Sequence, residues 1–97
     1  MTRSAFTVLA IALLTATAAF GDALSAERGR ELVERGEILP LEQILKQNEA
    51  SIDGRIIEVE IEQKCGSYVY EIKILGGDGR TREIKIDART GVIVSDD

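Results

Sequence analysis

The clearest structural signal in this chain is Arg55–Leu75, RIIEVEIEQKCGSYVYEIKIL. Residues 55–63 and 68–75 alternate apolar and polar side chains with a period of two, which is typical of strands with one buried face. The four residues between them, KCGS, include a glycine and are short enough for a tight hairpin loop. This stretch therefore predicts an antiparallel hairpin with one apolar face.

The register of the hairpin follows from the same alternation. Placing Gln63 opposite Tyr68 sets apolar residues against one another along one whole face. The predicted pairs on that face are Ile61 with Tyr70, Val59 with Ile72 and Ile57 with Ile74.

Two further strands are expected after this hairpin. Residues 82–87 alternate in the same way, and residues 92–94 follow a turn over 87–91. Pairing Ile72 with Ile84 and Tyr70 with Ile86 sets opposite charges against each other on the outer face, namely Lys73 with Glu83 and Glu71 with Lys85. A sheet with one apolar face needs a covering layer.

Two helices precede the strands, and the second has the clearer apolar stripe. Residues 26–35 form a weakly amphipathic helix, with Ser25 as the N-cap and Gly36 directly after the end. The second helix runs from Pro40, at the first helical position, to about residue 49, and its apolar face is Leu41, Ile44 and Leu45. Gly54, in the turn that follows, is available for a positive φ. We expect an α+β fold in which this helix packs on one face of a three- to four-stranded antiparallel β-meander.

The N-terminal segment has the pattern of a secretory signal peptide. Arg3 precedes the uncharged run 6–20, and small residues give cleavage sites at Ala16-Thr17-Ala18 or Gly21-Asp22-Ala23. We expect residues 1–23 to be the signal, cleaved somewhere between 18 and 26, and the protein to be periplasmic or secreted. An uncleaved anchor is the alternative, although the run is short for a membrane span.

Composition excludes several classes of function. The 97 residues include no His, no Trp and one Cys, so a Ser/His/Asp triad, a Cys/His pair and an intramolecular disulfide all lack parts. Seventeen acidic against 12 basic residues give a net charge of −5, which argues against a nucleic-acid partner. We predict a non-catalytic protein with no cofactor.

Two motifs resemble the PepSY domain family. They are the strand Val69-Tyr70-Glu71-Ile72 and the C-terminal segment Ile86-Asp87-Ala88-x-Thr90-Gly91-x-Ile93. The likeness spans about residues 38–94. The resemblance implies that 38–97 is a PepSY-like domain, with 24–37 as a short helix and linker. It also implies a module of bacterial secreted and envelope proteins, including propeptides of thermolysin-like metalloproteases, in which these motifs are structural.

The resemblance favours a protein-binding or regulatory module whose partner is an extracytoplasmic peptidase or a sensor domain. Glu58, Glu60 and Glu62 project from one strand face and are the candidate binding residues. Their spacing of about 6.6 to 7 Å is too wide for a tight metal site without further ligands, so we expect a solvated face that binds no metal.

Cys65 is a candidate reactive thiol in an exposed loop. Two interpretations stay open: an incidental free thiol, since the chain has no second cysteine, or a Cys65-linked homodimer formed in an oxidising compartment. The alternative function is therefore a structural envelope protein that oligomerises through Cys65 or a sheet edge and has no peptidase target.

Overall fold

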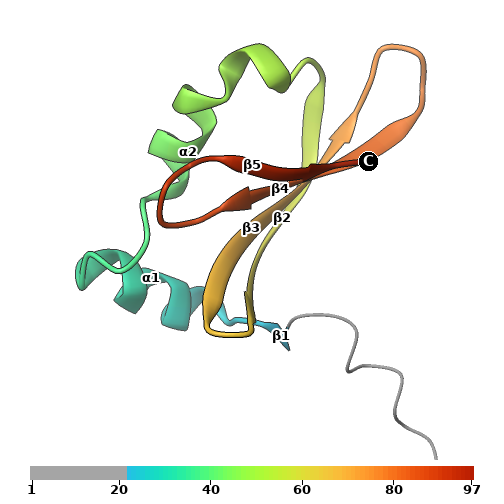
Figure 1. The fold of residues 1–97 in the computed structure, drawn as a ribbon. Coiled ribbons are helices and arrows are strands. Elements are labelled where there is room, and N and C mark those ends of the chain that lie inside the picture. The colour runs from blue at the N-terminus through green and yellow to red at the C-terminus, as the bar shows by residue number, and fades with distance from the viewer. Residues whose placement is uncertain (1–21) are drawn as a thin grey trace, which may run out of the picture.

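A computed structural model describes residues 22–97 and shows two helices on one side of an antiparallel sheet (Figure 1). The elements are β1 (Asp22–Ala23), α1 (Ala26–Glu34), α2 (Leu41–Gln47), the 3-10 helix η2 (Glu49–Ser51), β2 (Arg55–Lys64), β3 (Ser67–Leu75), β4 (Thr81–Asp87) and β5 (Ile93–Asp96). The strands follow the chain in the order β1-β2-β3-β4-β5. The α+β prediction is confirmed, and β1 is an additional strand that the sequence did not indicate. The predicted signal run 6–20 lies outside the described residues.

The register agrees with the prediction at all but one pair. Gln63 faces Tyr68, Ile61 faces Tyr70 and Val59 faces Ile72. The second hairpin also has the expected register, with Ile72 opposite Ile84 and Tyr70 opposite Ile86.

The predicted pairing of Ile57 with Ile74 is wrong. Ile56 faces Ile74, and the register shifts between Ile56 and Glu58. This bulge inserts one extra residue into β2, so Ile57 turns outward and is 45% exposed. A strict period of two along β2 does not allow for the extra residue.

The core lies between the helices and the inner face of the sheet. Its buried members are Leu32, Ile38, Ile44, Tyr70, Ile72, Ile74, Ile84, Ile86 and Ala88. α1 contributes Leu32 and α2 contributes Ile44, both fully buried, while Leu41 and Leu45 pack at the margin of the core. Within residues 22–97, no helix is long and apolar enough to cross a membrane.

The ends of α1 are those expected from the sequence. The Ser25 hydroxyl accepts a hydrogen bond from the backbone N–H of Arg28 at 3.0 Å, and Gly36 has φ +74° just after the helix. Gly29 faces β2 at close range, because a Cβ there would lie 2.6 Å from Cδ1 of Ile61. Glycine inside a helix costs roughly 1 kcal/mol relative to alanine. At Gly29 it also allows α1 to approach the sheet closely.

α2 differs from its prediction at both ends. Pro40 is the N-cap with an extended ψ of 152°, so it precedes the helix and is not its first residue. The helix ends at Gln47 because Asn48 leaves the helical conformation, and η2 follows as a separate turn. The Asn48 side-chain amide donates hydrogen bonds to the carbonyls of Ile44 (2.9 Å) and Gly91 (3.0 Å), which ties the end of α2 to the β4–β5 turn.

Gly54 has a different role from the one predicted. Its φ is not among the positive values, which belong to Gly36, Cys65, Gly66, Gly79 and Gly91 within the described chain. A Cβ at Gly54 would lie 2.5 Å from the backbone oxygen of Leu75. Close approach of two backbones, and not a left-handed conformation, requires glycine there.

Candidate functional site

The outer face of β2 carries the three predicted binding residues, and the structure divides them into two groups. Glu60 lies directly opposite Glu71 of β3, and the carboxylate oxygens of Glu60, Glu62 and Glu71 lie within 4.8 Å of one another. We call these three residues the acidic cluster. Glu58 stands outside it, because it forms an ion pair with Lys73 at 3.5 Å. Glu71 was not among the predicted binding residues, although the predicted register already set it opposite Glu60.

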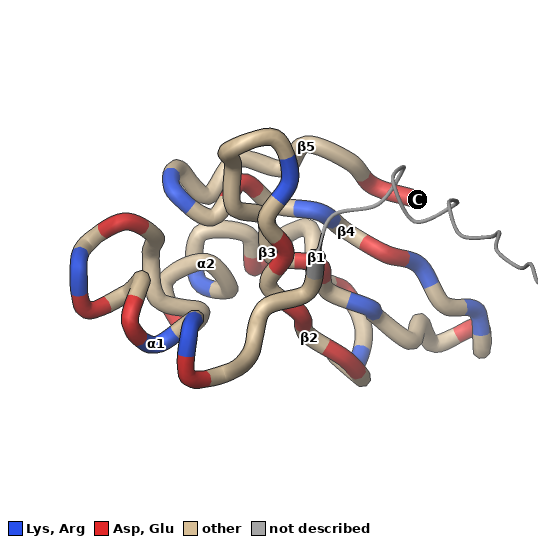
Figure 2. The backbone as a smooth tube through the Cα atoms, turned by 90° about the horizontal axis from the view of Figure 1, so that it is seen from below, with Lys and Arg blue, Asp and Glu red and all other residues tan. Residues whose placement is uncertain are grey.

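Basic residues of β3 and β4 neutralise part of this face. Lys73 also lies 3.9 Å from Glu83, and Lys85 pairs with Glu71 at 3.6 Å. The distribution of charge along the strands can be followed in Figure 2. These are exposed or half-exposed pairs of the kind that contribute little to stability. The predicted mixed-charge face is present, with an excess of negative charge at Glu60 and Glu62.

Partial burial raises the pKa of Glu62, and the neighbouring carboxylate of Glu71 raises it further. Among the described residues, the acidic cluster could ligate a cation. The carboxylates of β2 alone are too widely spaced for a tight site, but Glu71 of β3 adds a third carboxylate close to Glu60 and Glu62. Exposed carboxylates often gather on strands without a metal. The expectation that this face binds no metal stays a prediction.

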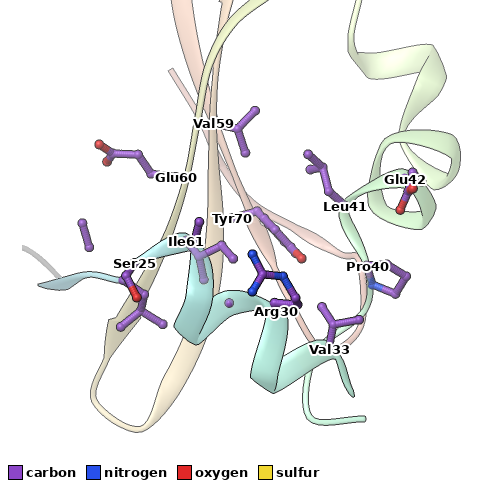
Figure 3. Close-up of a pocket in the computed structure, with 14 residues that line it drawn as sticks. Ser25, Arg30, Val33, Pro40, Leu41, Glu42, Val59, Glu60, Ile61 and Tyr70 are labelled. Carbon is purple, nitrogen blue, oxygen red and sulfur yellow. The ribbon is translucent and has the colours of Figure 1, made fainter. Parts of the chain in front are cut away.

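A groove lies on the opposite side of β2, between the strand and the two helices. It has a volume of about 560 Å³ and is mostly apolar. Val59 and Ile61 form one wall and Leu41 the other, and Arg30 of α1 rises between them (Figure 3). Glu60 also borders the groove, but its side chain points away from it, toward the outer face of β2. This groove was not predicted, because its walls come from segments far apart in the chain.

Cys65 lies at the tip of the β2–β3 hairpin and is exposed, as predicted. Cys65 and Gly66 have φ values of +51° and +80°, which is the geometry of a two-residue hairpin turn with two left-handed residues. No second cysteine is present in the chain, so a disulfide would have to be intermolecular. Reactivity of this thiol stays a prediction.

The turn between β4 and β5 is built by Asp87. Its carboxylate accepts hydrogen bonds from the backbone N–H groups of Arg89 (2.8 Å) and Thr90 (3.0 Å), and Gly91 has φ +83°. Burial alone would raise the pKa of Asp87, but these hydrogen bonds outweigh it and hold the pKa below its usual value. Ala88, the next residue in the turn, is fully buried and belongs to the core.

Tyr70 links the sheet to the segment between the helices. Its hydroxyl donates a hydrogen bond to the backbone oxygen of Leu39 at 2.7 Å, and the Leu39 N–H donates to the oxygen of Ala88 at 2.8 Å. Burial raises the pKa of Tyr70. The motifs around Tyr70 and Asp87 thus have structural roles. Residues 38–97, which contain both motifs, match the family model PepSY, described as the peptidase propeptide and YPEB domain. The chain belongs to the PepSY family.

The PepSY match covers α2 and all of β2 to β5, whereas β1 and α1 precede it. The Val69–Ile72 strand and the Asp87–Gly91 turn are structural in this PepSY protein, as the resemblance implied. No curated protein and no solved structure matches the chain.

Proposed function

We propose that this PepSY protein is a non-catalytic, extracytoplasmic module that binds a protein partner and regulates it, the partner being a peptidase or a sensor domain. The family supports this proposal, because its description names peptidase propeptides. The groove between β2 and the helices is the observation that carries it, since an apolar hollow of about 560 Å³ on so small a domain offers a place for another chain to dock.

Catalysis has little support from the described residues. The acidic cluster faces outward from the sheet. The hydroxyl groups that line the groove, Ser25 and Tyr70, are engaged in the cap of α1 and in the hydrogen bond to Leu39, and the chain has no histidine to activate them. A protein-binding role needs only surface and shape, and both are present.

The proposal is tested by adding purified protein to the extracytoplasmic fraction of its source cells and measuring peptidase rates with casein as substrate. We expect a dose-dependent change in one peptidase activity, and crosslinking in intact cells should join the protein to that enzyme or to a sensor. No rate change together with no crosslinked partner would refute the proposal.

Export is tested separately, because the predicted signal lies outside the described residues. Residues 1–26 fused to alkaline phosphatase should yield active enzyme, which requires the oxidising compartment. The control replaces Leu13 and Leu14 with arginine to break the apolar run. Equal activity from both fusions would contradict an exported protein.

The alternative role, oligomerisation through Cys65, is supported by the position of this thiol at an exposed hairpin tip. Electrophoresis with and without reductant distinguishes it from the regulatory role.

A further inference from the structure

The edge of β2 is only partly covered. β1 pairs with Glu62 and Gln63, and the Leu24 N–H donates to the oxygen of Ile61 at 2.8 Å. Because backbone groups alternate direction along a strand, those of Val59 point to the same open side as those of Ile61. Within residues 22–97, no strand pairs with Val59 on that side. Unpaired strand edges of this kind accept an added strand.

On the helix-facing side of this edge, the side chains that β2 itself contributes are apolar. Val59 and Ile61 border the groove, and a second hollow of about 440 Å³ continues past Glu42 to Ile56. α2 faces both hollows, so an added strand would direct every second side chain between β2 and this helix. Arg30 and Glu42 line the groove with opposite charges, so this pair leaves no net charge to favour a cation or an anion, and the apolar side chains around it favour apolar residues.

The other side of the same edge is acidic. Side chains of an added strand that point outward would lie beside Glu58 and Glu60. Glu58 has Lys73 at 3.5 Å, whereas Glu60 opposes Glu71 and forms no ion pair within the described residues. A basic side chain beside Glu60 would supply the missing positive charge.

We infer that the open edge of β2 binds an extended peptide segment of a partner protein in which apolar and basic residues alternate. The apolar residues enter the groove, the basic residues face the acidic cluster, and main-chain hydrogen bonds to Val59 fix the register. This inference rests on the proposed protein-binding function and gives the chemistry of the partner's segment.

The test uses the full chain and three fluorescein-labelled heptapeptides measured by fluorescence anisotropy at low salt. The first, KVKVKVK, has the required alternation. The second, EVEVEVE, keeps the apolar residues and reverses the charge, and the third, VVVKKKK, has the composition of the first without alternation. We expect KVKVKVK to bind at least about tenfold more tightly than either of the others, and to weaken as salt is added.

Two variants locate the site. Val59→Pro removes the outward N–H while keeping an apolar residue, and it should weaken KVKVKVK at least about tenfold. Glu60→Gln should weaken the peptide by several-fold, whereas Glu83→Gln, which removes a carboxylate from β4 on the same face, should not. Circular dichroism checks that Val59→Pro is folded. If this variant unfolds, the comparison of Glu60→Gln with its control Glu83→Gln tests the site.

Equal binding of KVKVKVK and VVVKKKK, or unchanged binding in a folded Val59→Pro or in Glu60→Gln, would overturn the inference. Its failure differs from failure of the proposed function. A partner that still crosslinks to Val59→Pro and Glu60→Gln refutes this site and leaves the regulatory role, whereas peptide binding without any cellular partner or rate change refutes the regulatory role alone.

Discussion

Replacing Gly54 with alanine should destabilise the protein even though glycine has the higher conformational entropy in the unfolded chain. An alanine Cβ would lie 2.5 Å from the backbone oxygen of Leu75 and 2.8 Å from Cγ2 of Ile74. Ile74 is fully buried, and the Leu75 oxygen belongs to the backbone of β3, so neither atom is free to move aside. Relief of the overlap requires the start of β2 to shift away from β3.

The expected size follows from two opposing effects. Overpacking of this kind costs about 1–3 kcal/mol. The reduced entropy of the unfolded alanine chain offsets roughly 0.4–1 kcal/mol of that amount. Gly54→Ala should therefore lower the free energy of unfolding by about 1–2 kcal/mol, which in urea moves the midpoint down by roughly 1 M for a small domain.

The assay is urea unfolding followed by circular dichroism, with Gly77→Ala as the matched control. A Cβ at Gly77 meets nothing within 4 Å, and its φ is not positive, so the control should be unchanged or slightly more stable. If Gly54→Ala proves as stable as Gly77→Ala, the close approach of β2 and β3 at Leu75 is not what requires glycine, and the reasoning fails.

Four further outcomes are expected. Ile44→Ala should lower the free energy of unfolding by about 2–5 kcal/mol in the same assay, because Ile44 is fully buried and fixes α2 to the sheet; a loss below about 1 kcal/mol would contradict this. Asp87→Ala should destabilise by roughly 1 kcal/mol at neutral pH. The pKa of Asp87 is lowered in the folded protein, so its carboxylate stabilises the fold above the ordinary pKa of aspartate, and this stabilisation is lost as the pH falls through the lowered pKa. The variant and the parent should therefore become equally stable in acid. A difference in the free energy of unfolding that stays constant with pH in urea titrations would contradict this role of Asp87. The pKa of Glu62 is raised in the folded protein, so its ionised carboxylate destabilises the fold. Glu62→Gln should therefore be more stable than the parent at neutral pH by about 0.2–1 kcal/mol, and equally stable below the ordinary pKa of glutamate. Oxidised protein should run as a dimer on non-reducing gels and Cys65→Ser as a monomer; a parent that stays monomeric under oxidant would rule out the disulfide.

The strands were predictable because alternation in β2, β3 and β4 is local information. The second hairpin needed nothing more, since pairing Ile72 with Ile84 buries one face and matches charges on the other. The bulge at Ile57 was not predictable, because two adjacent isoleucines fit the apolar face equally well. Only the packing of Ile56 against Ile74 decides which of them is inside.

The candidate site was predictable only in part. The common direction of Glu60 and Glu62 follows from the period of a strand, and Glu71 could have been added from the predicted register. The groove could not be foreseen, because it depends on how far α2 stands from β2. Side chains such as Leu41 and Val59 come within reach of each other only after the whole chain has folded.

The groove has walls of two different origins. The family match begins at residue 38, so β2 and α2 belong to the shared domain, whereas Arg30 and Val33 come from a helix that precedes it. A nine-residue helix that docks through Leu32 and the bare surface of Gly29 is a small, separable piece of sequence. Exchanging the exposed residues of that piece, while keeping Gly29 and Leu32, would reshape one wall of the groove and leave the closing turn and the acidic cluster unchanged, so the proposed binding specificity could change without a change of fold.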